Sequence, residues 1–266
     1  MFLRPSPKTY QVKTVYTLYS HNSTGFYYPI HSLALTDYNE LIDLNFSFTI
    51  INLVCNDSSP LLLVLVHSSP NNFEKRRTIR ETWGKNSDSV KVLFMIGSVA
   101  SSYLQRDLEN ENDMYNDFVQ GSFLDTYRNI TYKHVMIFKY VIYHCPQAKY
   151  ILKTDDDVFV NIPSMENFLT VDLSPFWSQQ NVVLHAKETF KNDVHITGTL
   201  MEKIHLAHTD IESLVISRKM LRFIVDYSYN ISESFLFGPA NIDDKEIRAL
   251  WKFVSTHSVP RSVLRG

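Results

Sequence analysis

The chain has 266 residues, of which 44% are hydrophobic, so it can form the core of one large domain or two small ones. The net charge is −2, with neither a basic stripe that would indicate a nucleic-acid partner nor an acidic tail that would indicate disorder. The composition therefore favours a globular protein that does not bind nucleic acid.

The first 58 residues are rich in Tyr, Ser and Asn and show little periodicity, so we expect a loosely structured stem or linker there. The chain begins Met1-Phe-Leu-Arg-Pro, without an apolar core or a small-residue cleavage site. Its longest apolar run, Leu61–Val66, is far shorter than the ~20 residues that a membrane-spanning helix needs. No membrane anchor is visible, as expected of a lumenal fragment or of a chain with an incomplete N-terminus.

Two features bear on the cellular compartment. The two cysteines, Cys55 and Cys145, are compatible with a disulfide or with two buried thiols, because their number alone does not separate these possibilities. Five segments match the N-glycosylation pattern, which points to the secretory lumen. Their acceptors are Asn22, Asn45, Asn56, Asn129 and Asn230. Asn129 directly precedes a predicted helix, which disfavours its use.

From residue 61 onward, apolar strands of the buried, parallel type alternate with helices. Gly84 ends the first helix, which is basic, and Pro146 follows the last. The predicted order is strand 61–67, helix 73–83, strand 90–96, helix 101–118, strand 118–120, helix 131–144 and strand 150–154. This alternation with short turns predicts an α/β fold with a mainly parallel, doubly wound sheet flanked by helices.

Three consecutive acidic residues, Asp155, Asp156 and Asp157, follow directly after the strand that ends at Thr154. Adjacent carboxylates repel one another at the edge of a core, and a divalent cation such as Mg²⁺ or Mn²⁺ relieves that repulsion. A cation held there would neutralise a diphosphate leaving group, and open α/β sheets bind nucleotides at this end of their strands. The pattern indicates the Asp-x-Asp element of a nucleotide-sugar glycosyltransferase, with Asp155 and Asp157 as its ends.

Other interpretations of the acidic triplet are simpler. A lone acidic triplet is most often a solvated turn, although the apolar segments on both sides disfavour that here. A calcium-binding EF-hand loop is excluded, because Phe159 and Val160 occupy positions that require a ligand and a glycine. A metal-dependent phosphohydrolase would need further His and Asp ligands at recognisable spacing, and none is found.

Three segments occur in a specific order: Arg76 to Gly84, Phe123 to Lys133, and Cys145 to Asn161. Over roughly residues 60–165 the chain thereby resembles the β-1,3-glycosyltransferase family that includes the β-1,3-galactosyltransferases. The resemblance implies a GT-A fold, a Mn²⁺ cofactor and a type II membrane protein on the lumenal side of the Golgi apparatus membrane. It implies a hexosyltransferase that moves galactose or N-acetylhexosamine from a UDP-sugar to a glycan or glycoprotein, in β-1,3 linkage and with inversion. We expect the transferase domain over 59–254, with 255–266 as a tail.

The resemblance also assigns site residues. Arg77 and Arg80 share one helix face and would hold phosphate or base, although a solvated basic surface is the simpler interpretation. Asp155 and Asp156 would contact the nucleotide-sugar, and Asp157 would bind the metal. Inverting transfer needs a general base, and Asp193 is the candidate, within the segment from Asn192 to Gly198. His208 is the nearest counterpart of the family's late metal-binding His, although a structural histidine is the simpler interpretation. The first acidic position of the base motif is Asn192, which carries no charge.

The region between Asp157 and Asp193 is short for this family, which places two further strands and an acceptor loop there. The sequence therefore predicts an internal deletion near 169–191 that truncates the acceptor half. A non-catalytic nucleotide-binding pseudoenzyme, or an impaired variant, is the main alternative function. Residues Leu214–Ser217 and Ser234–Trp251 are expected to form a C-terminal extension without chemistry of its own.

Overall fold

The structure is a computed structural model that describes residues 46–172, 182–185, 214–227 and 235–257. All of these residues fall within one compact unit, formed by Tyr28–Glu188 and Ser213–Gly266. For 182–185 only the backbone is described. The predicted site residues Asp193 and His208, and the sequons at Asn22, Asn45 and Asn230, lie outside the described residues.

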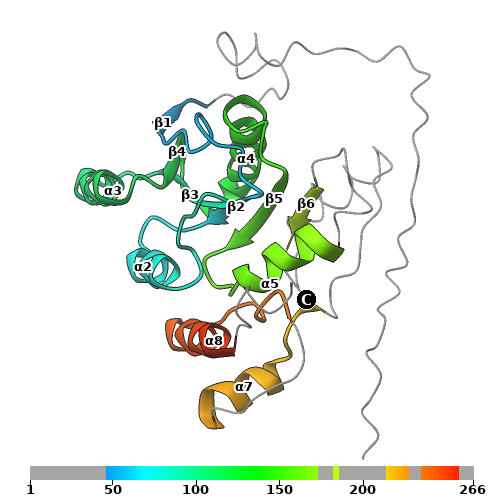
Figure 1. Cartoon of the computed structure of the whole chain (residues 1–266). Helices are drawn as coiled ribbons and strands as arrows, with labels where there is room; N and C mark the ends of the chain where they lie inside the picture. Colours follow the sequence, from blue (N-terminus) through cyan, green and yellow to red (C-terminus); the bar gives the residue numbers. More distant parts are fainter. Residues whose placement is uncertain (1–45, 173–181, 186–213, 228–234, 258–266) are drawn as a thin grey trace, which may run out of the picture. The chain divides into compact units, whose positions relative to one another are not determined.

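A six-stranded sheet forms the centre of this unit, in the order β1-β4-β3-β2-β5-β6 (Figure 1). The five strands from β2 to β6 run parallel, whereas β1 pairs antiparallel with β4. The strands are β1 Phe48–Ile51, β2 Leu62–His67, β3 Val90–Ser98, β4 Phe118–Leu124, β5 Tyr150–Asp155 and β6 Val182–His185. The mainly parallel α/β sheet expected from the sequence is confirmed.

The central strands are buried on both faces, as their continuous apolar sequences predict. Every residue of β2 is buried, and Leu63 is paired in register with Ile151 of β5. Side chains at alternate positions point to opposite faces of a sheet. Leu63 and Leu65 accordingly join the cluster beneath helix α4 (Ile130–His144), whereas Phe94 of β3 packs beneath helix α2 (Phe73–Glu81) on the other face.

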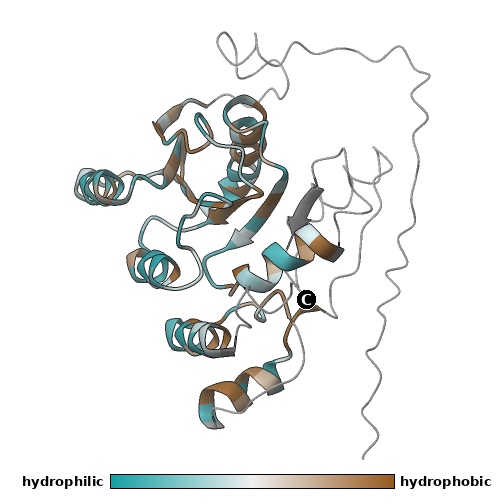
Figure 2. Cartoon of the chain, viewed as in Figure 1, coloured by the Kyte–Doolittle hydropathy of each residue, from teal (hydrophilic) through white to brown (hydrophobic). Residues whose placement is uncertain are grey.

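The helices differ in how much of their surface they bury. Helix α4 contributes a row of buried residues that includes Met136, Ile137 and Tyr140. Helix α3 (Ser102–Tyr115) buries Leu108 alone, and it is mostly hydrophilic in Figure 2. The remaining helices are η1 Tyr127–Asn129, α5 Ile162–Asn167, η2 Phe168–Asp172, α7 Arg218–Tyr227 and α8 Asp244–His257.

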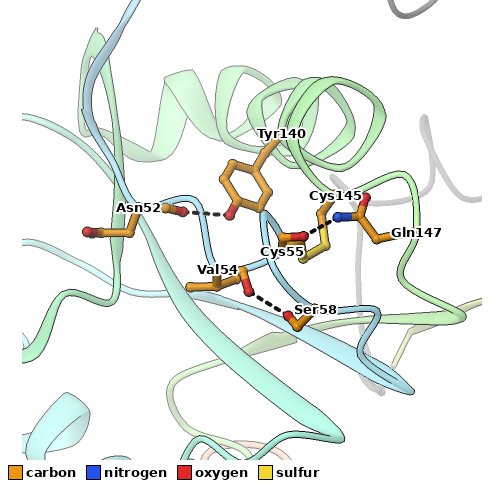
Figure 3. The surroundings of a disulfide bond; sticks show 7 residues. All are labelled: Asn52, Val54, Cys55, Ser58, Tyr140, Cys145 and Gln147. Atoms are coloured by element: carbon orange, nitrogen blue, oxygen red, sulfur yellow. Dashed lines mark hydrogen bonds between the residues drawn. A yellow bond between two sulfur atoms is a disulfide. The ribbon is translucent and has the colours of Figure 1, made fainter.

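The domain extends further toward the N-terminus than the boundary predicted at residue 59. Strand β1 completes one edge of the sheet, and Cys55 forms a disulfide with Cys145 at the end of α4, with Cα atoms 5.3 Å apart (Figure 3). The Tyr140 hydroxyl donates a 2.6 Å hydrogen bond to the Asn52 carbonyl, and the Gln147 amide donates to the Cys55 carbonyl. The sequence suggested a stem because β1 is a short edge strand, in which the alternation of apolar and polar residues is weak.

The C-terminal boundary also differs from the prediction, since α8 continues to His257 without a break at residue 254. Helix α8 packs against α2 on the side opposite to α4, and the Arg248 guanidinium reaches Glu81 at 2.6 Å and the Thr78 hydroxyl at 3.1 Å. Strand β6 lies within the region where a deletion was predicted and extends the sheet beside β5.

Candidate functional site

The acidic triplet lies where the strand order of the sheet reverses. From β2 the chain proceeds outward through β3 and β4, and it then returns to place β5 on the other side of β2. Ligands of open α/β sheets bind at such switch points, outside the carboxyl ends of the strands. His67 ends β2 and pairs in register with Asp155, the last residue of β5. The triplet therefore occupies the position that the fold provides for a nucleotide.

Asp155, the last residue of β5, and Asp156, the first residue of the turn, have their partners on opposite faces of the sheet. Asp155 lies on the α4 face, near His67 and Lys153, whose Nδ1 and Nζ atoms are each 3.8 Å from its Oδ1. The His67 ring packs edge-on against His134 of α4, with centroids 4.7 Å apart. Buried cationic and imidazole groups thus surround Asp155, which is itself half-buried.

Asp156 points to the other face, where the start of α2 binds it. Its Oδ2 accepts hydrogen bonds from the Ser68 hydroxyl and the Asn72 amide, both at 2.8 Å, and Lys75 lies 3.4 Å from its Oδ1. A carboxylate at the N-terminus of a helix is also stabilised by the helix dipole. These contacts make Asp156 the link between the triplet and α2. Its predicted contact with a nucleotide-sugar stays a prediction.

Asp157 is the carboxylate that the sequence predicts as the metal ligand. Its Oδ1 is buried, while the residue as a whole is half-buried, and its backbone carbonyl accepts a 3.1 Å hydrogen bond from Ile242. Divalent cations in nucleotide sites are held by one or two carboxylates together with phosphate oxygens. Within the described residues, no group of three or more His, Cys, Asp or Glu side chains is placed to hold a metal unaided. The donor set fits a cation shared with a diphosphate.

A second ion pair joins the carboxyl ends of three strands. Lys133 of α4 lies 2.9 Å from Asp125 and donates a 2.7 Å hydrogen bond to the Ser68 carbonyl. Asp125 in turn accepts a 2.7 Å hydrogen bond from the Gly97 amide. Lys133 is buried and Asp125 is half-buried, so this pair fixes the carboxyl ends of β2, β3 and β4 relative to one another. The sequence offered a signal for it, because both residues belong to the second family motif.

The buried arginine of the first motif is Arg76, which sequence reasoning passed over in favour of its neighbours. Its guanidinium is fully buried and pairs with Glu111 of α3 at 2.7 Å. It also donates to the Ser68 hydroxyl at 3.1 Å and to the Ser69 carbonyl at 2.6 Å. Arg76 therefore holds the loop between β2 and α2, including the serine that donates to Asp156. Arg76 and Arg77 are neighbours on a helix and therefore point in different directions. The sequence does not show which of the two is buried, and the structure shows that it is Arg76.

Arg77 and Arg80 are not brought into contact with the triplet. Arg77 is 57% exposed, and its partners are Glu74 and Glu81 on its own helix. Among the described residues, Arg80 makes ion pairs of 2.7 Å with Glu111 and Asp117. Burial raises the pKa of Asp117 even though Arg80 opposes that shift. Their predicted nucleotide contacts stay predictions, while Asn72 and Lys75, which precede this motif, contact Asp156.

Two sequons fall within the described residues, and they differ in accessibility. Asn56 is exposed on a turn beside the disulfide. Asn129 occupies the N-cap position of α4 without a side-chain capping hydrogen bond, and its side-chain nitrogen donates a 2.8 Å hydrogen bond to the Leu124 carbonyl. The atom to which a glycan is attached is thus already engaged at Asn129. No helix in the described part of the chain is long and apolar enough to cross a membrane.

The acidic turn lies at the switch point of a mainly parallel α/β sheet, which is where proteins of this fold class bind their ligands. Residues 74–189 match the model of the galactosyltransferase family. The chain is 37% identical over 141 residues to the UDP-GalNAc:beta-1,3-N-acetylgalactosaminyltransferase 1 of Rattus norvegicus, covering 50% of this chain and 43% of that one. It is 38% identical over 138 residues to the lactosylceramide 1,3-N-acetyl-beta-D-glucosaminyltransferase of Xenopus tropicalis, covering 46% and 36%.

Residues 74–189 are therefore similar to the β-1,3-glycosyltransferase family, a resemblance that the three ordered motifs also indicate. The chain spans less than half the length of these curated relatives. The family match includes Asp125, Lys133 and the acidic triplet, but it ends before α7 and α8.

Proposed function

We propose that this protein is a UDP-sugar-dependent hexosyltransferase that transfers galactose or an N-acetylhexosamine to a hydroxyl of a glycan or glycoprotein. The observation that carries the proposal is the acidic triplet at the switch point, within a galactosyltransferase-family domain. The relatives' names include a UDP-GalNAc-dependent enzyme and a lactosylceramide N-acetylglucosaminyltransferase, both acting in 1,3 linkage. We extend the β-1,3 linkage, and inversion at the anomeric carbon, to this chain as part of the proposal.

The donor would bind across the carboxyl ends of β2 and β5. Asp155, flanked by Lys153 and His67, would accept hydrogen bonds from the ribose or the donor sugar. Asp157 would hold a Mn²⁺ ion, which when bound neutralises the charge that develops on the diphosphate leaving group. Asp156 keeps both neighbours in place through Ser68 and Asn72. Asp193 would take the proton from the acceptor hydroxyl.

We place this activity in the lumen of the Golgi apparatus. The disulfide between Cys55 and Cys145 supports an oxidising compartment, because such bonds are rare in the cytosol. The exposed sequon at Asn56 agrees with passage through the secretory pathway. Association with the Golgi membrane is part of the proposal and rests on the family alone.

A second candidate function is a donor-binding protein that does not transfer sugar. It is favoured by the short region between the triplet and Asp193, and by Asn192 in place of an acidic residue. Incubation with UDP-galactose, UDP-GalNAc or UDP-GlcNAc and a galactose-terminated acceptor, followed by mass spectrometry, separates the two candidates. A sugar-extended acceptor together with free UDP supports the transferase. UDP binding without an extended acceptor supports the second candidate.

A further inference from the structure

The segment 235–242, here called the backing segment, lies directly against the acidic turn although it is about 80 residues away in sequence. In Figure 1 the C-terminal part of the chain comes beside α5, which follows β5. The Leu236 carbonyl accepts a 2.8 Å hydrogen bond from the backbone amide of Asn161. The backbone amide of Gly238 donates a 2.8 Å hydrogen bond to the Phe159 carbonyl. The Ile242 amide donates at 3.1 Å to Asp157. The backbones of residues 157, 159 and 161 are thus each hydrogen-bonded to the backing segment.

Side chains reinforce this backbone pairing. The side-chain amide nitrogen of Asn161 donates a 2.9 Å hydrogen bond to the Phe235 carbonyl. The side-chain oxygen of Asn161 accepts a hydrogen bond from the Ser164 backbone amide and so caps α5. Phe159 and Phe235 lie side by side, with ring centroids 6.3 Å apart. A Cβ atom added at Gly238 would come within 2.9 Å of the Phe159 Cβ, closer than such atoms pack. Glycine at this position therefore permits the close approach of the two segments.

The backing segment is itself anchored to the helix that binds the other side of the triplet. It leads into α8, whose Arg248 pairs with Glu81 and donates to Thr78 of α2. The start of α2 supplies Asn72 and Lys75 to Asp156. The acidic turn is consequently held on one side by α2 and on the other by the backing segment, and α8 connects the two.

From this geometry we infer that the backing segment is a positioning element that sets the location of Asp157 and thereby the affinity for a nucleoside diphosphate with its divalent cation. The backing segment lies outside the residues that match the family model, which end at residue 189. The identity of the ligand in this inference rests on the proposed function. The contacts between the backing segment and the acidic turn are independent of that function. A misplacement of ~1 Å of a group at a reacting centre can lower the reaction rate ~100-fold.

The test compares two glycine substitutions of matched chemistry. Gly238→Ala forces the backing segment away from Phe159. Gly121→Ala is the control, because its added Cβ would meet Phe123 at 2.4 Å on β4, at the other side of the sheet from β5. Affinity for UDP is measured by calorimetry with Mn²⁺ present, and amide hydrogen exchange is followed in peptides that cover residues 157–161. Asn161→Ser, which keeps a cap for α5 but loses the bond to Phe235, is the second variant.

We expect Gly238→Ala to weaken UDP binding about tenfold or more and to speed exchange in 157–161, while Gly121→Ala changes affinity less than about twofold. Equal affinity in Gly238→Ala and the unchanged chain would overturn the inference. If Gly238→Ala does not fold, Asn161→Ser is judged by the same criteria. If the unchanged chain binds no UDP, the proposed function fails, and exchange alone decides: unaltered exchange at 157–161 in both variants would refute the positioning role.

Discussion

At the scale of single residues, Asp155 and Asp156 have different partners because they lie on opposite faces of the sheet. Asp156 is buried and receives hydrogen bonds from Ser68 and Asn72, so its charge stabilises the fold. Asp155 lies on the opposite face beside Lys153 and His67, where the proposed donor would bind. The sequence shows three equivalent carboxylates, and only the pairing of β5 with β2 separates them.

Two matched substitutions test this division of roles. Asp156→Asn removes the charge that accepts hydrogen bonds from Ser68 and Asn72, and we expect it to lower the free energy of unfolding by about 1.5–3 kcal/mol. Asp155→Asn is expected to cost less stability but to weaken UDP binding more. Urea denaturation and UDP titration of both variants give the comparison. The reverse order of effects would show that the two faces have been assigned the wrong way round.

At the scale of elements, the disulfide ties the segment before β2 to the end of α4. It closes a loop between residues 90 apart in sequence, and Tyr140 packs beside it with its hydroxyl on Asn52 (Figure 3). Burial raises the pKa of the Tyr140 hydroxyl, so it stays a neutral donor at physiological pH. These contacts add residues 46–58 to the domain, although their composition resembles that of a linker.

Replacing both cysteines by serine should therefore destabilise the domain. In the chain-entropy model, a loop of this length restricts the unfolded chain by about 4–5 kcal/mol, and removal of a native disulfide commonly costs ~2–5 kcal/mol. Urea denaturation of the double variant, alongside the unchanged chain with and without reductant, measures the difference. A free energy of unfolding that is the same in all three samples would contradict a structural role for the bond.

The sequence predicted the order of the elements because buried parallel strands and capped helices have strong local patterns. Strand β2 and helix α4 fall within a residue or two of their expected bounds. The sequence could not predict that the Ile242 amide would donate a hydrogen bond to the Asp157 carbonyl, nor that Arg76 rather than Arg80 would contact Ser68. Such contacts depend on packing between segments that are far apart in the chain. Short edge strands such as β1 and β6 carry too few residues for a periodic signal.

At the scale of the whole molecule, the length of the region after the acidic triplet determines how much of the acceptor side can form. The sheet carries β6 next to β5, in the region where the sequence predicted missing strands. A parallel sheet is covered on both faces, so a shortened acceptor half would expose apolar surface and displace the base. We expect transfer, where it occurs, to be slower than that of a full-length relative, while donor binding is better retained.

The two described sequons should differ in occupancy when the chain is secreted from cells behind a signal sequence. Asn56 is exposed, whereas the Asn129 side chain is bonded to the Leu124 carbonyl at the start of α4. We expect mass spectrometry of tryptic glycopeptides to find a glycan at Asn56 and an unmodified Asn129. Asn56→Gln should then increase electrophoretic mobility, and Asn129→Gln should not. A glycan found at Asn129 but absent from Asn56 would contradict the structural distinction.

The most direct measurement is calorimetric titration of UDP into the unchanged chain, with and without Mn²⁺, and into Asp157→Ala. Removing the carboxylate that would hold the cation leaves the diphosphate charge uncompensated. We predict that Mn²⁺ strengthens UDP binding about tenfold or more in the unchanged chain, and that this gain disappears in Asp157→Ala while binding without Mn²⁺ is unaltered. Equal UDP affinity in the presence and absence of Mn²⁺ would contradict a donor site built on the acidic triplet.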